Sequence, residues 1–120
     1  MNEIRMGMAE SRFADIIWQH EPMTTKDLVA ACSEVLQWKR TTTYTVLKRL
    51  CERGIFQMQD SVVTSLISKD EFYALQSQRF VDDVFNGSLP AFLAAFTAHK
   101  KLSEQEVAEI LRQIDRIGKE

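Results

Sequence analysis

Basic and hydroxyl side chains are concentrated in one short stretch, WKRTTTYTVLKRL, which runs from Trp38 to Leu50. Between Lys39 and Arg53 there are five cations against one acid, Glu52, so this segment has a net charge of +4 in a chain whose net charge is −2. Hydroxyl groups can hydrogen-bond to phosphates and base edges, and lysine and arginine neutralise phosphates. The chemistry that this segment could perform is therefore the binding of a nucleic-acid groove.

A helical projection at 100° per residue divides this segment into two faces. The inner face holds mainly apolar residues: Thr43, Val46, Leu47, Leu50 and Cys51. The outer face and its flanks hold the residues that we predict to contact DNA: Lys39, Arg40, Thr41, Thr42, Tyr44, Thr45, Lys48, Arg49 and Arg53. A solvated basic face is the alternative interpretation, and the place of this helix in the predicted fold favours DNA binding over it.

The remaining residues offer little for catalysis or metal binding. His20 and His99 are isolated, Cys32 and Cys51 do not form a CxxC pair, and the glycines are too dispersed for a phosphate loop. We therefore expect no enzymatic activity, no metal and no cofactor. No segment approaches the roughly 18 apolar residues of a membrane span, so we also expect a cytoplasmic protein with no membrane partner.

Three helices and a hairpin are predicted for the N-terminal half. Pro22 ends the first helix, a capping pattern at Thr24 begins the second, and Gly54 ends the third, which contains the threonine-rich segment. The other predicted bounds are about 9–20 and 25–35 for the first two helices, and 55–59 and 62–67 for two short strands. This order predicts a mainly α fold with a winged helix-turn-helix, three helices plus a β-hairpin wing, as a DNA-binding domain over 1–67.

Helical patterns continue beyond Ser68, at about 69–85, 89–98 and 104–117. Their apolar residues are more than three short helices can bury among themselves, so a second copy of the chain should cover the excess. The residues predicted at this dimer interface are Phe72, Phe80, Val84, Phe85, Phe92, Phe96, Val107, Ile110, Leu111 and Ile114. Residues 68–120 are therefore predicted to be a helical dimerisation region.

A series of residues along most of the chain follows a known pattern. It comprises Trp18, Glu21-Pro22, Thr24, Trp38, Thr42, Thr45, Leu47, Arg49-Leu50, Gly54, Phe85-Asn86-Gly87-Ser88 and Leu102-Ser103-Glu104-Gln105-Glu106. This pattern resembles the penicillinase-repressor family (BlaI/MecI/CopY). The resemblance implies a homodimeric winged-helix transcriptional repressor that binds a palindromic operator, an inverted repeat of double-stranded DNA. It places the recognition helix on Thr42, Thr45 and Arg49, and the dimerisation helices on about 69–117.

Several positions depart from the family pattern. Lys39 stands where the family commonly has a serine cap, and the wing Gln59-Asp60-Ser61-Val62-Val63 has no cation. The cation-free wing leaves open an alternative function, a winged-helix protein-interaction module or co-regulator without strong DNA binding of its own. The stretch Leu93-Ala94-Ala95-Phe96 lacks the asparagine next to which β-lactam-responsive members are cleaved, and the C-terminus lacks the cysteine motif of copper-responsive members.

Overall fold

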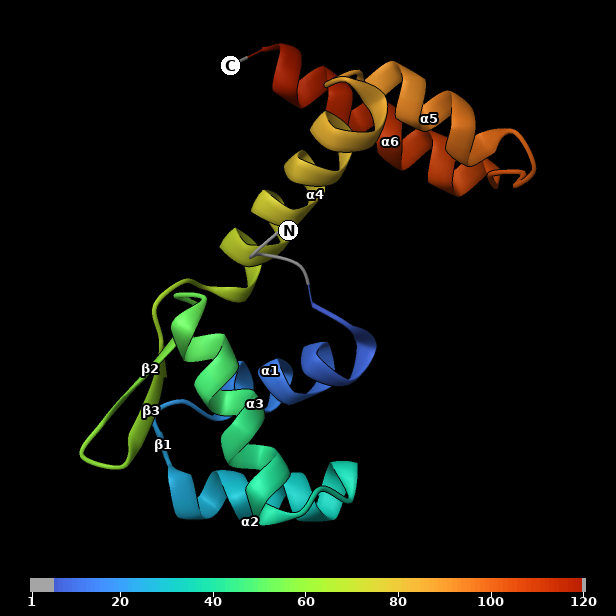
Figure 1. Cartoon of the computed structure of the whole chain (residues 1–120). Coiled ribbons are helices and arrows are strands. Elements are labelled where there is room, and N and C mark those ends of the chain that lie inside the picture. Colours follow the sequence, from blue (N-terminus) through green and yellow to red (C-terminus); the bar gives the residue numbers. More distant parts are fainter. Residues whose placement is uncertain (1–5, 120) are drawn as a thin grey trace. The chain divides into compact units, whose positions relative to one another are not determined.

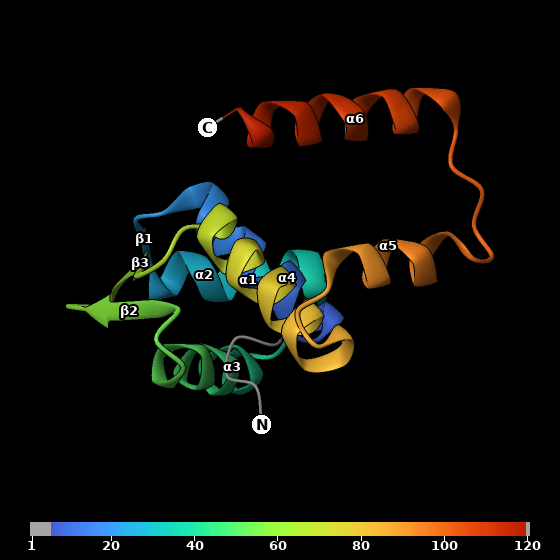
Figure 2. The same ribbon diagram turned by 90° about the horizontal axis from the view of Figure 1, so that it is seen from above.

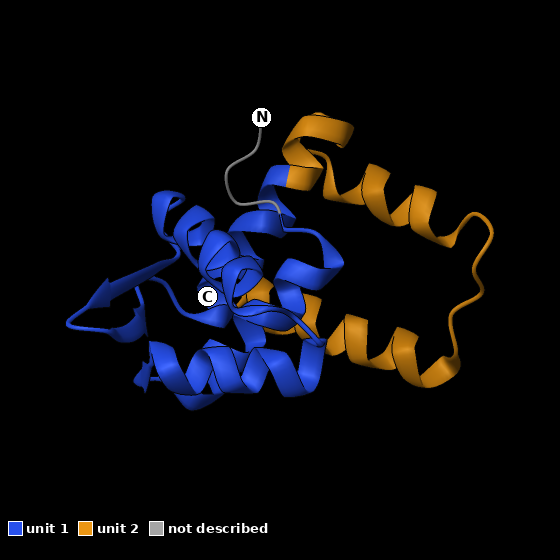
Figure 3. Cartoon of the chain, turned by 60° about the horizontal axis from the view of Figure 1, so that its bottom comes forward, with its two compact units in different colours: residues 1–79 blue, residues 80–120 orange. Residues whose placement is uncertain are grey.

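The computed structural model of this chain describes residues 6–119. It contains two compact units, an N-terminal unit that extends to Arg79 and a C-terminal unit that begins at Phe80 (Figure 3). Helix α4, Lys69–Phe85, contributes its first turns to the N-terminal unit and its last residues to the C-terminal unit. The fold is mainly helical and has the element order of a winged helix followed by further helices, as the sequence predicts (Figure 1).

Three helices begin the N-terminal unit: α1, Met8–His20; α2, Thr25–Leu36; and α3, Arg40–Glu52. The predicted capping pattern before α2 is confirmed, because the Thr24 hydroxyl accepts a hydrogen bond from the Asp27 amide at 3.1 Å. After α3, Gly54 has a φ of +78°, a left-handed conformation that glycine adopts without a steric penalty. Local sequence signals therefore set the start of α2 and the end of α3.

The hairpin consists of β2, Phe56–Gln59, and β3, Val62–Ser65, joined by a two-residue turn. Asp60 and Ser61 both have positive φ values, 52° and 62°, as a tight hairpin turn requires. A third strand, β1, Met23–Thr24, which the sequence pattern does not predict, pairs antiparallel with β3, so that the strand order is β1-β3-β2. The Thr25 amide also donates to the Ser61 carbonyl at 2.9 Å, which ties the hairpin to the start of α2.

The core of the N-terminal unit lies between the three helices and the sheet. Its fully buried large side chains come from all of these elements: Phe13, Ile17, Leu28, Leu50, Ile55, Phe56 and Val63. Two tryptophans close its edges. Trp38 stacks on Phe13 with ring centroids 5.5 Å apart, and the indole N–H of Trp18 donates to the Ile67 carbonyl at 3.1 Å.

One predicted dimer residue belongs to this core instead. Phe72 is 0% exposed, and its ring lies 5.8 Å from Trp18 and 5.5 Å from Tyr73. Lys69, one turn earlier on α4, forms an ion pair with Asp15 of α1 at 2.8 Å. The assignment of Phe72 to the dimer interface is therefore wrong, because the first turns of α4 pack on α1 and bury that ring within the chain.

The C-terminal unit contains the end of α4, α5, Leu89–Thr97, and α6, Glu104–Gly118. The start of α6 is capped by Ser103, whose hydroxyl accepts from the Glu106 amide while the Glu106 carboxylate accepts from the Ser103 amide. Aromatic rings of Phe80, Phe85 and Phe92 contact one another at centroid distances of 5.7 to 6.1 Å. Even so, none of the described residues from 80 to 119 is buried.

Candidate nucleic-acid interface

Helix α3 is two-sided in the structure, as the helical projection predicts. Thr43, Val46, Leu47 and Leu50 are buried against the rest of the N-terminal unit, and Cys51 is half-buried. Figure 2 shows α1, α2 and the sheet on one side of α3. The other side carries exposed cations and hydroxyls, which we call the α3 outer face: Thr41, Thr42, Thr45, Lys48 and Arg49.

Local contacts order the first turns of α3. Lys39 is the N-cap residue and its side chain makes no capping hydrogen bond, because an ammonium group has no acceptor for the amides of the first turn. The hydroxyls of Thr43 and Thr45 donate to the carbonyls four residues earlier, at 3.2 and 2.9 Å. Because a hydroxyl that donates still has acceptor capacity, Thr45 can accept a hydrogen bond from a base amino group.

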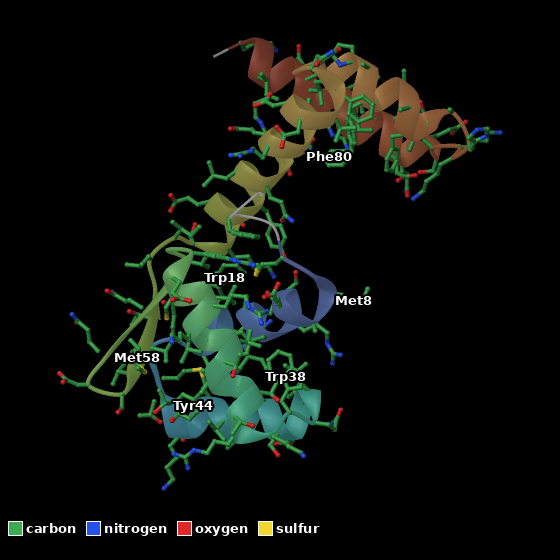
Figure 4. All side chains as sticks on the ribbon, in the orientation of Figure 1. Met8, Trp18, Trp38, Tyr44, Met58 and Phe80 are labelled. Atoms are coloured by element: carbon green, nitrogen blue, oxygen red, sulfur yellow. The ribbon has the colours of Figure 1, made fainter. Side chains whose placement is uncertain are left out.

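Tyr44 lies at the edge of the α3 outer face and is half-buried (Figure 4). The Arg40 guanidinium is 5.5 Å from the centre of its ring, within the range of a cation–π interaction. Lys39 and Arg40 are both exposed. The first turn of α3 therefore places two cations and a phenol next to the threonines.

Two of the predicted site residues, Arg49 and Arg53, form ion pairs with Glu10 of α1. Arg49 Nη1 lies 2.8 Å from Glu10 Oε2, and Arg53 Nη1 lies 3.7 Å from Glu10 Oε1. The side chain of Arg49 remains 47% exposed and that of Arg53 remains 24% exposed. Glu10 was not singled out in the sequence, because 39 residues separate it from Arg49 and no local pattern joins them.

The wing presents neutral and acidic groups. Gln57, Met58, Gln59, Asp60 and Ser61 are exposed (Met58 is labelled in Figure 4). The Gln57 amide donates to the Thr64 hydroxyl across the two strands at 3.2 Å. Neither strand nor the turn between them contains a lysine or arginine, so the positive charge available for phosphates in this part of the unit comes from α3.

The thiols have no reactive environment. Cys32 is buried and Cys51 is half-buried, and burial raises the pKa of both thiols above the ordinary cysteine value. A raised pKa favours the protonated, unreactive form at neutral pH. The part of the chain that the structure describes contains no cluster of three or more His, Cys, Asp or Glu side chains that could hold a metal ion.

Helix length and composition also bear on membrane insertion. Among the described residues, no helix combines enough length with enough apolar character to cross a bilayer.

Comparison with known proteins agrees with this arrangement. Residues 6–116 match the model of the family described as penicillinase repressor. The chain is 24% identical over 111 residues to a penicillinase repressor of Bacillus licheniformis, covering 89% of this chain and 87% of that protein. It is also 24% identical over 109 residues to the methicillin resistance regulatory protein MecI of Staphylococcus aureus, covering 88% and 89% of the two chains.

A penicillinase repressor of Staphylococcus aureus is 20% identical over 121 residues, which cover 98% of this chain and 96% of that protein. The family match therefore spans the winged helix and nearly all of the helices that follow it. The chain belongs to the penicillinase repressor family, as the residue pattern of its sequence indicates.

Proposed function

We propose that this protein is a transcriptional repressor that binds, as a homodimer, an inverted repeat of double-stranded DNA. The observation that carries the proposal is the α3 outer face, where cations and hydroxyls are exposed on a helix whose opposite side is anchored in the core. Such a helix can enter a major groove, with its threonines at base edges and its cations at phosphates. Membership of a repressor family supports the same function and a cytoplasmic location.

Each predicted DNA-contacting residue has a role in this proposal. Thr41, Thr42, Tyr44, Thr45 and Arg49 contact bases or phosphates. Lys39, Arg40, Lys48 and Arg53 contribute mainly electrostatic attraction to the backbone.

The C-terminal helices, within the proposed dimerisation region 68–120, supply the dimer. Exposed apolar side chains there include Phe80, Val84, Phe96, Val107, Leu111 and Ile114, each 42 to 59% exposed, while Phe85, Phe92 and Ile110 are half-buried. A mainly apolar cavity of about 210 Å³ lies between α5 and α6 and is lined in part by Leu93, Ile110 and Leu111. Since a large exposed apolar surface favours association, a second copy is the partner that we propose. In the resulting dimer two copies of α3 would reach half-sites about 34 Å apart.

The experiment that tests this function is a footprint of the purified protein on the DNA upstream of its own gene, repeated over a salt series. We expect a protected inverted repeat whose affinity falls steeply with salt, because phosphate contacts release counterions. Weak, unlocalised protection at every salt concentration would refute the proposal.

The exposed Asp60 at the turn of a cation-free wing favours one second candidate function, a protein-interaction module. An acidic wing would repel DNA phosphates and could instead face a basic protein surface. Crosslinking from a photoreactive residue at Thr45, with and without DNA, separates the two functions. Crosslinks to DNA support the repressor, and crosslinks to a protein alone support the module.

A further inference from the structure

Glu10 contacts three groups: the Gly7 amide at the N-cap of α1, Arg49 of α3, and Arg53 at the C-cap of α3. Its Oε1 accepts from the Gly7 amide at 3.3 Å and lies 3.7 Å from Arg53 Nη1, while its Oε2 accepts from Arg49 Nη1 at 2.8 Å. Both carboxylate oxygens are therefore engaged. The Gly7 contact ties the carboxylate to the first turn of α1, so both arginines contact a group that this helix start holds in place.

The environment of Glu10 strengthens these contacts. Its side chain is only 16% exposed, so solvent and salt screen the ion pairs less than those of a fully exposed pair. Burial by itself would raise the pKa of Glu10. The hydrogen bonds from Arg49 and from the Gly7 amide, together with the positive charges of Arg53 and Arg49, outweigh burial and lower the pKa below the ordinary glutamate value. Glu10 is thus a charged partner throughout the neutral pH range.

The contact restricts Arg49 without removing it from the surface. One terminal nitrogen of the guanidinium is held by Glu10, yet the side chain remains 47% exposed. The guanidinium is planar and carries five N–H donors in fixed directions, so holding one nitrogen restricts the directions in which the others can point. An unrestrained arginine could contact phosphates in many positions, whereas an oriented arginine can contact a group of the DNA only where that group lies in line with its N–H donors.

We propose that Glu10 is a positioning residue that holds Arg49 in one orientation on the α3 outer face, and that it thereby increases the discrimination between the operator and other DNA. The inference rests on the proposed repressor function. Glu10 also places a negative charge beside the cations of α3, so it weakens attraction to phosphates of any sequence. Loss of the Glu10 carboxylate should therefore strengthen binding to non-specific DNA and, at the same time, reduce the preference for the operator. Simple damage to the fold would not produce this combination.

The test compares Glu10→Gln with the parent chain on two DNA fragments of equal length. One is the fragment protected in the footprint, and the other is the same fragment with its sequence scrambled. Glutamine keeps an oxygen for the Gly7 amide, so the helix start is preserved while the charge is lost. We expect tighter binding to the scrambled fragment and a roughly tenfold smaller ratio of the two affinities, the size of effect that one well-placed base contact has.

Two further variants make the test specific. Glu34→Gln removes the same charge from an exposed site on α2, and it should shift both affinities in parallel and leave their ratio unchanged. In an Arg49→Ala background, Glu10→Gln should no longer change the ratio, because the residue that it positions is absent. Circular dichroism and thermal unfolding establish that each variant is folded.

The outcomes separate the two proposals. A parent chain that does not distinguish the fragments would refute the repressor function and this inference with it. If the parent distinguishes them but Glu10→Gln has the same ratio, or Glu34→Gln lowers the ratio equally, the positioning role alone is overturned. A change in ratio that persists without Arg49 would likewise overturn it.

Discussion

Two exposed apolar side chains of α6, Leu111 and Ile114, allow the proposed dimer to be tested quantitatively. Leu111 is 59% exposed and Ile114 is 53% exposed, and both lie on the same side of the helix. Complete burial of a leucine or isoleucine side chain contributes about 1.5–3 kcal/mol, so covering the exposed half of each contributes roughly 1 kcal/mol. A symmetric dimer contains each residue twice, and the double variant Leu111→Ala/Ile114→Ala should therefore lose about 4 kcal/mol of association free energy.

This loss corresponds to an increase of about a thousandfold in the dimer dissociation constant. Sedimentation equilibrium over a range of protein concentrations measures it directly. The matched control is Gln105→Ala, an exposed position on the opposite side of α6, which should leave the dissociation constant unchanged. If the dissociation constant of the double variant lies within about threefold of the parent's, Leu111 and Ile114 do not lie at a dimer interface. A monomeric parent at every concentration would refute the dimer itself.

Three further predictions concern the N-terminal unit. Lys48→Ala should reduce the magnitude of the slope of log affinity against log salt, for the footprinted fragment, by about 1.8, since each of two copies loses one phosphate contact. Lys101→Ala in the C-terminal unit should leave this slope unchanged. An unchanged slope would show that Lys48 does not reach the backbone. Ser61→Gly should raise the free energy of unfolding, measured with urea, by about 0.5 kcal/mol, because Ser61 has a φ of 62° that glycine adopts without strain. A decrease would contradict that explanation of the turn. Because the folded-state pKa of Glu10 is lowered, its ion pairs stabilise the fold above the unfolded-state pKa, and this contribution is lost as pH falls through the folded-state pKa. The stability difference between the parent and Glu10→Gln should thus be largest near neutral pH and shrink once the pH falls below the ordinary pKa of an unfolded-state glutamate, about 4.3. A pH-independent difference would exclude the charge as its source.

The local features of this fold could be read from short stretches of sequence. The capping patterns at Thr24 and Ser103 depend on residues three positions apart, and the structure forms both. The turn at Asp60-Ser61 likewise needed only the two apolar stretches on either side of it. The division of α3 into a buried and an exposed face followed from the 3.6-residue period, because that period does not depend on what the helix packs against.

Two features of the fold required contacts between distant residues. The two-residue strand β1 is too short to have a pattern of its own, and it exists because β3 supplies its hydrogen-bond partners. Phe72 has the same apolar character as the phenylalanines beyond it, and only the docking of α4 on α1 determines that it is buried within the chain. Apolar character predicts that a residue will be covered, but it does not predict which surface covers it.

The candidate interface divides in the same way. The side chains that α3 exposes can be predicted from the sequence, because helix periodicity and charge are local properties. The contacts of Glu10 with Arg49 and Arg53 cannot be predicted in this way, since they depend on how the fold brings the start of α1 to the end of α3, 39 or more residues away in the chain. An ion pair between distant residues forms only when the fold brings them together. The sequence therefore identifies the carboxylate and the guanidinium groups, but it does not show how they are oriented.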